Sequence, residues 1–176
     1  MDRRLQIQLA AVPLLVLLVS IGMTPAATRL HIIASGETHA MLDPCDCPDS
    51  PDGGLARRAR MLTRLRKDES FLLVDAGGFA GGGIYDSYTG GRTRDSLRTI
   101  ATIAAMGEMA YDAVAVGDDD LQYGARWLRQ TATRAGVPLV SANCFDNAGG
   151  PLFDRYRVIE AGDQRIAITA LTSPER

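Results

Sequence analysis

Histidine, cysteine and surplus positive charge are all scarce in this sequence, and each scarcity limits what the protein can do. The 176 residues include two histidines and three cysteines, and 19 basic against 21 acidic side chains give a formal net charge of −2. Proteins that bind nucleic acids usually carry a basic surplus, so we expect no nucleic-acid partner. Neither a second cysteine pair nor a His-x-x-His motif accompanies Cys45 and Cys47, which disfavours a structural zinc site.

The N-terminal segment has the pattern of a secretory signal. Residues 1–4 (MDRR) supply positive charge, residues 9–23 are mostly apolar, and small residues permit cleavage after Ala26. The apolar stretch is shorter than the about 20 residues that span a bilayer, so membrane contact is expected only if this segment stays uncleaved. We predict a signal peptide at 1–26, a domain at 27–176, and export to the periplasm or the extracellular space.

The cysteines allow two interpretations in an exported protein. An oxidising environment permits disulfides, and an odd count leaves at least one thiol free, bound to a metal or joined to another chain. One alternative is a disulfide from Cys144 to Cys45 or Cys47. The other is a thiol module, in which Cys45 and Cys47 hold a soft metal or perform redox chemistry.

Strand-like and helix-like segments alternate along the mature chain. Short apolar, β-branched runs predict strands at residues 29–34, 71–74, 113–116 and 139–142. Helical spacing of apolar residues predicts helices over about 14 residues from Leu55, around residues 97–104, and over residues 125–135 before Gly136. Two further strands, at 156–160 and 165–171, flank a turn and predict a hairpin. The alternation predicts an α/β fold with a mainly parallel sheet.

Polar loops follow three of the predicted strands. Residues 76–91, which we call the glycine-rich loop, hold seven glycines. Functional groups in such sheets gather at the carboxyl ends of the strands, so these loops are the candidate site. The three candidate loops cover residues 35–40, 75–83 and 117–123, and we call them the first, second and third loops. The second loop overlaps the glycine-rich loop.

Taken together, these segments resemble one known family. Residues 30–42 (LHIIASGETHAML), 53–66 (GGLARRARMLTRLR), 71–79 (FLLVDAGGF) and 109–124 (MAYDAVAVGDDDLQYG) resemble the metallophosphoesterase (calcineurin-like) domain of the secreted 5′-nucleotidase and UDP-sugar hydrolase family. The resemblance runs from about residue 30 to residue 175. It implies a layered α/β sandwich, a pair of divalent metal ions (Zn, Mn or Co), and a small phosphorylated substrate such as a nucleotide.

The resemblance also assigns metal-ligand positions, and most of them are altered in this chain. The family's D-x-H falls on Glu37 and His39, so the histidine is kept while the carboxylate is one methylene longer. The metal-bridging Asp of D-A-G-D falls on Gly78, which has no side chain to offer. The Asn of G-N-H-E-F-D falls on Asp118, which can still ligate a metal.

Both members of the family's catalytic His–Asp pair are replaced, by Asp119 and Gln122. Neither residue supplies an imidazolium near neutral pH. The family's later histidine ligands, which end in G-H-x-H, are absent from the sequence, so we expect a domain that is incomplete at its C-terminus. The sequence thus predicts a metal-dependent phosphomonoester or nucleotide hydrolase of weak or no activity.

Two alternatives remain beside that prediction. The first is a non-catalytic domain that binds a partner or a single divalent ion such as Ca or Mn. The second is the cysteine-based thiol module. The ion in the first alternative would be held by Glu37, His39, Asp118, Asp119 and Asp120.

Overall fold

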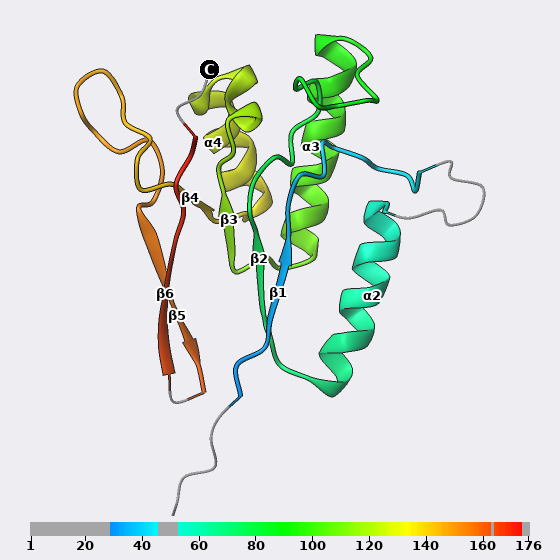
Figure 1. The fold of residues 1–176 in the computed structure, drawn as a ribbon, viewed down its shortest axis with the longest axis vertical. Coiled ribbons are helices and arrows are strands. Elements are labelled where there is room, and N and C mark those ends of the chain that lie inside the picture. The colour runs from blue at the N-terminus through cyan, green and yellow to red at the C-terminus, as the bar shows by residue number, and fades with distance from the viewer. Residues whose placement is uncertain (1–28, 46–52, 163, 174–176) are drawn as a thin grey trace, which may run out of the picture.

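The computed structural model describes residues 29–45, 53–162 and 164–173. The predicted signal peptide and Cys47 lie outside these residues. Figure 1 shows the elements in chain order. They are β1 (Ile32–Ser35), α2 (Leu55–Asp68), β2 (Leu72–Asp75), α3 (Arg92–Glu108), β3 (Ala113–Ala115), the 3₁₀ helix η1 (Asp119–Tyr123), α4 (Ala125–Ala135), β4 (Leu139–Val140), β5 (Tyr156–Ala161) and β6 (Gln164–Thr169).

The first four strands form one parallel sheet in the order β1-β2-β3-β4. In its register, Ser35 lies beside Asp75, and Asp75 lies beside Val114. Strands β5 and β6 form a separate antiparallel hairpin. The α/β class and the mainly parallel sheet are therefore confirmed.

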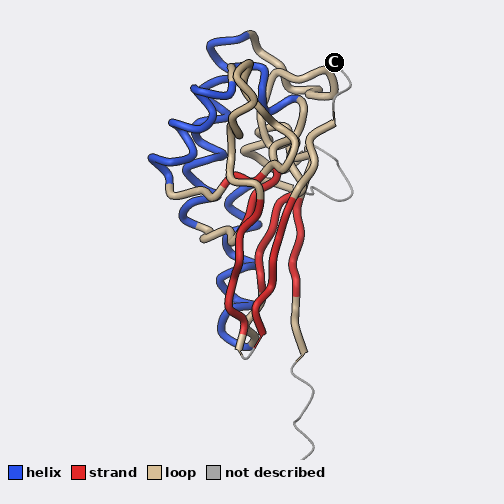
Figure 2. The backbone as a smooth tube through the Cα atoms, turned by 90° about the vertical axis from the view of Figure 1, so that its left-hand side faces the viewer, coloured by secondary structure: helices blue, strands red, loops and turns tan. Residues whose placement is uncertain are grey.

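The helices pack on one face of the parallel sheet, as Figure 2 shows. Leu62 of α2, Ile103 of α3 and Leu128 of α4 are each at most 1% exposed, and they join Leu73 and Val114 of the strands in one apolar core. Burying these side chains is the main stabilising contribution to the fold. No helix among the described residues is long and apolar enough to cross a bilayer.

Two segments differ from the sequence-based prediction. Helix α3 begins at Arg92, several residues earlier than its apolar spacing indicated, because its first turn is polar. The stretch that follows β3 is not simply a loop, because a 3₁₀ turn covers Asp119–Tyr123. The Asp118 carboxylate caps that turn by accepting a hydrogen bond of 2.9 Å from the Asp119 N–H.

Removing the α2 anchor should destabilise the domain. We expect Leu62→Ala to cost about 2–5 kcal/mol of unfolding free energy, because it leaves a cavity between helix and sheet. The neighbouring Met61, which is 50% exposed, provides the control, since Met61→Ala leaves no cavity. Denaturant unfolding of both variants checks this, and equal losses would contradict the assigned helix face.

Candidate functional site

The loops that follow β1, β2 and β3 meet at the carboxyl ends of these strands, where their backbones touch. The Glu37 N–H donates to the Gly77 carbonyl at 2.8 Å, and the His39 N–H donates to the Gly78 carbonyl at 2.9 Å. A Cβ on Gly77 would lie only 2.7 Å from the Gly117 nitrogen, and the φ of Gly77 is +94°. Glycine is therefore required at position 77 for the second and third loops to approach.

A buried carboxylate, that of Asp120, ties the second loop to the third. Its Oδ2 accepts hydrogen bonds from the N–H groups of Gly78 at 3.0 Å and Gly117 at 2.8 Å, and its Oδ1 accepts from the Ala80 N–H at 2.8 Å. Burial raises the pKa of Asp120 to about 7, and the three N–H donors oppose that rise. Both carboxylate oxygens are occupied by backbone groups, so Asp120 holds the loops in place.

Asp75, at the end of β2, is held in a similar way. Its carboxylate accepts hydrogen bonds from the Ser35 hydroxyl at 2.5 Å and from the Gly77 N–H at 2.9 Å. Tyr111 contacts the same Ser35 hydroxyl at 2.7 Å. Burial raises the pKa of Asp75, against the hydrogen bond from Ser35. Through these contacts, Asp75 joins the end of β2 to the end of β1, where the first two loops begin.

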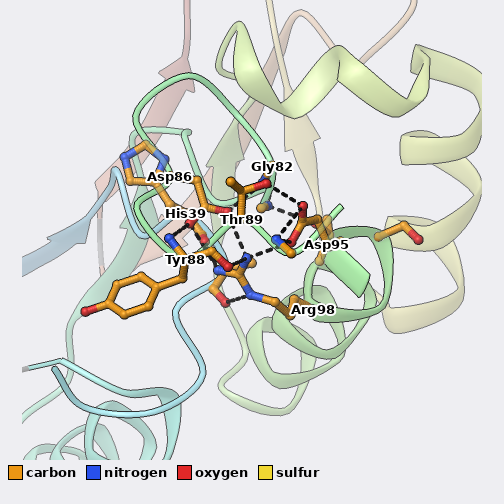
Figure 3. A network of polar contacts seen from close by, with 12 residues as sticks. His39, Gly82, Asp86, Tyr88, Thr89, Asp95 and Arg98 are labelled. Atoms are coloured by element: carbon orange, nitrogen blue, oxygen red, sulfur yellow. Dashed lines mark hydrogen bonds and ion pairs between the residues drawn. The ribbon is translucent and has the colours of Figure 1, made fainter. Parts of the chain in front are cut away.

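A partly buried arginine of α3, Arg98, links the glycine-rich loop to the first loop (Figure 3). The Arg98 guanidinium donates to the carboxylates of Asp86 at 2.8 Å and Asp95 at 2.9 Å. It also donates to the carbonyls of His39 at 2.8 Å and Ala40 at 3.2 Å. The two carboxylate side chains are at most 2% exposed, so this is a buried ionic network that is satisfied on several sides.

The pKa values of both carboxylates in this network are lowered. Burial alone would raise the pKa of Asp86, but the Arg98 guanidinium and the Gly82 N–H together lower it. Burial also acts to raise the pKa of Asp95, and hydrogen bonds from the Thr89 hydroxyl and from Arg98 more than offset it. Both groups are therefore held in the charged form in the folded protein.

Of the predicted metal ligands, Glu37 and His39 lie close together. The Glu37 Oε2 is 3.4 Å from the His39 Nε2, and the His39 side chain is largely buried. The Nδ1 of His39 is buried and lacks a hydrogen-bond partner among the described residues. The Glu37 carboxylate lies directly over Gly78, since a Cβ built there would be 2.7 Å from the Glu37 Cδ.

Of the residues at the other predicted positions, Asp119 and Gln122 contact the glycine-rich loop and Asp118 makes a contact within its own turn. Asp118 caps the 3₁₀ turn. Asp119 is 3% exposed, and a Cβ on Gly83 would lie 2.8 Å from its Oδ1. The Gln122 amide donates to the Gly81 carbonyl at 2.7 Å. Asp119 and Gln122 therefore pack against or hydrogen-bond to the glycine-rich loop.

The donor set does not fit a two-metal centre. Within the described part of the chain, no three His, Cys, Asp or Glu side chains are grouped so that they could hold an ion. Glu37 and His39 converge, and the buried Nδ1 of His39 lacks a hydrogen-bond partner among the described residues, but Gly78 offers no ligand and Asp118 is engaged as a cap. The residues that the structure describes therefore do not form a site for a pair of metal ions.

The expected disulfide between Cys144 and Cys45 does not form. Cys144 lies just after β4, where its buried Sγ contacts the Thr172 hydroxyl at 3.2 Å. Cys45 lies in the loop that follows β1, and β1 and β4 are opposite edges of the sheet. The alternative pairing with Cys47 falls outside the described residues.

Sequence reasoning missed Arg98, Asp86 and Asp95. The arginine is one of many in the chain, and its carbonyl partners are 58 and 59 residues away. The only available signal was the glycine-rich loop itself, because a loop with so little side-chain packing needs other groups to hold it. That signal does not identify which residues provide them.

No established family profile matches the chain, but individual proteins of one kind do. It is 29% identical over 145 residues to a trifunctional nucleotide phosphoesterase of Bacillus subtilis, a match that covers 77% of this chain and 10% of that protein. It is 28% identical over 171 residues to the venom 5′-nucleotidase of Gloydius brevicauda, covering 89% of this chain and 27% of the relative.

Solved structures agree with the sequence matches. A 5′-nucleotidase precursor from Thermus thermophilus superposes with a TM-score of 0.67 at 29% identity, covering 82% of this chain and 29% of that one. The Bacillus protein, whose solved structure is described as a calcineurin-like phosphoesterase, has a TM-score of 0.63 at 25% identity, covering 83% and 49%.

The parallel sheet and its strand-end loops thus form an α/β domain with the arrangement of these phosphoesterase neighbours. The relatives and solved structures that this chain resembles in sequence and fold are 5′-nucleotidase and calcineurin-like phosphoesterases, the family that its motifs resemble. It spans only 10% and 27% of the lengths of the two relatives matched in sequence.

Replacing Asp120 should loosen the site. Asp120→Asn turns an NH₂ group toward at least one backbone N–H and leaves that buried donor unsatisfied. We therefore expect the free energy of unfolding to fall by about 1–3 kcal/mol. Thermal unfolding measures the effect, with Asp68→Asn at the exposed end of α2 as the control. If the two variants unfold alike, Asp120 does not hold the loops.

The Arg98 network should make stability depend on pH. Because the pKa values of Asp86 and Asp95 are lower in the folded than in the unfolded state, their stabilising contribution is present above about pH 4 and is lost as the pH falls further. Arg98→Met should lower the free energy of unfolding by about 3 kcal/mol at pH 7, because it leaves the two carboxylates without their cation. Denaturant titrations at several pH values should show that cost shrinking in acid.

The conservative variant Arg98→Lys is the control, because it keeps the charge and loses the branched set of donors. It should cost less than Arg98→Met at neutral pH. A cost of Arg98→Met that does not change with pH would contradict the ionic role of the network.

Proposed function

We propose that the chain is a 5′-nucleotidase-like phosphoesterase domain in which hydrolysis of its substrate is weak or absent. The observation that carries the proposal is the likeness to nucleotide phosphoesterases over most of the chain, combined with the substituted residues at the strand ends. Those relatives favour a small phosphorylated substrate, such as a nucleotide. The signal-like N-terminus favours an exported protein.

The weakness of catalysis follows from the positions of three residues. Asp119, which replaces the family's catalytic histidine, is buried against Gly83 and has no imidazole to donate to a phosphoryl group. Gln122, in place of the partner aspartate, is bonded to the Gly81 carbonyl. Gly78 lacks the carboxylate that the resemblance gives to a bridge between Zn, Mn or Co ions. Losing one such group typically lowers the rate by about 100-fold or more.

The non-catalytic alternatives have narrower support. A single-ion site would rest on Glu37 and His39, because Asp119 and Asp120 make their contacts inside the loops. A thiol module would need Cys45 and Cys47 together with a partner, and Cys144 lies at the opposite edge of the sheet. We therefore favour the degenerate phosphoesterase.

The proposal is tested by assaying phosphomonoester and nucleotide hydrolysis with Mn, Co and Zn. The purified full chain should be at least about 100-fold slower than the Thermus thermophilus 5′-nucleotidase measured in parallel. Any residual rate should survive His39→Ala. Rapid hydrolysis that His39→Ala abolishes would instead make the chain an active metal-dependent enzyme.

A further inference from the structure

The space over Gly78 is taken by a side chain from another loop. A Cβ built on Gly78 would lie 2.7 Å from the Cδ and 3.1 Å from the Cα of Glu37. The first distance is shorter than non-bonded carbon atoms tolerate, so no side chain fits at position 78 unless the Glu37 carboxylate moves.

This proximity is fixed by the backbone. The N–H groups of Glu37, His39 and Ala40 donate in turn to the carbonyls of Gly77, Gly78 and Phe79 at 2.8–2.9 Å. Glu37, His39 and Ala40 all have positive φ, between +43° and +50°, a conformation that few non-glycine residues adopt. The first loop is therefore pressed along the second, which brings the Glu37 side chain over position 78.

The second loop is equally restrained. The Gly78 N–H is bonded to the buried Asp120 carboxylate at 3.0 Å, and the Arg98 guanidinium fixes the first loop through the His39 and Ala40 carbonyls. Neither backbone can move away without breaking buried hydrogen bonds, which is costly. The conflict between residue 37 and a side chain at residue 78 has to be resolved by the side chains themselves.

We propose that the Glu37 carboxylate and a side chain at position 78 compete for the same space, so that Glu37, whose side chain is 72% exposed, occupies in its present position the place where a second carboxylate would meet a divalent cation. The inference rests on the proposed function for the meaning of that place, but the exclusion itself is a statement about packing. The two substitutions at these positions are then one coupled change. The longer carboxylate at position 37 can take its present position because residue 78 is a glycine and has no side chain.

A thermodynamic cycle on stability tests the exclusion directly in the full chain. Gly78→Ala should lower the melting temperature in the wild type and lower it less in the Glu37→Ala background, where the carboxylate is gone and the residue-37 Cα, 3.1 Å from the new Cβ, is still in place. We expect the two effects to differ by about 2–4 °C. The strain of an alanine at positive φ is present in both backgrounds and cancels in the difference.

Gly136→Ala provides the matched control. Gly136 has a φ of +71°, close to the +73° of Gly78, but a Cβ there would meet nothing within 4 Å. Its cost should be the same with and without Glu37. If Gly78→Ala also costs the same in both backgrounds, the exclusion is refuted, and the cycle requires neither metal nor activity.

A second measurement tests whether a divalent cation can bind beside position 78, in the space that the Glu37 carboxylate occupies. Titrating Mn²⁺ into each protein, we expect stoichiometric binding to Glu37→Asp combined with Gly78→Asp, and weaker binding to the wild type and to Gly78→Asp alone. Tight binding by the wild type, equal binding by the single and double variants, or no gain in a folded double variant would each overturn the proposal. Rapid hydrolysis would refute only the proposed function, because neither measurement reads turnover.

Discussion

The guanidinium of Arg98 makes the contacts on which the arrangement of the loops depends. It neutralises the two buried carboxylates of Asp86 and Asp95, and it donates to carbonyls of the first loop that have no regular secondary structure to satisfy them. A loop with seven glycines loses much conformational freedom on folding and has few side chains with which to recover stability. Together with Asp120, Arg98 supplies that stability through polar contacts.

The fold was largely predictable because its signals are local. Helix α2 begins at Leu55 and α4 covers Ala125–Ala135, as the apolar spacing of those segments predicted. Helix α3 begins earlier than predicted because its first turn carries polar residues, which periodicity cannot separate from a loop. The parallel sheet and the position of the loops at its carboxyl edge followed from the alternation of strands and helices.

The site was predictable only as a set of positions. The motifs located Glu37, His39, Gly78 and the aspartates, but their contacts join residues from separate loops, and those distances are set by the tertiary structure. Nothing in the sequence indicated that Glu37 lies over Gly78 or that Asp119 is buried against Gly83. In both places a carboxylate fills space that a glycine leaves open, so substitutions that look independent in the sequence are neighbours in the structure.

We propose that the protein's own side chains, rather than metal ions, hold and fill the strand-end loops. Thermal unfolding of the full chain with excess Mn²⁺ or Zn²⁺, compared with unfolding in a chelator, tests it most directly, because a ligand that binds the folded state raises the melting temperature by mass action. The account predicts the same melting temperature in all three conditions. A rise of several degrees with either ion, lost in His39→Ala, would contradict it.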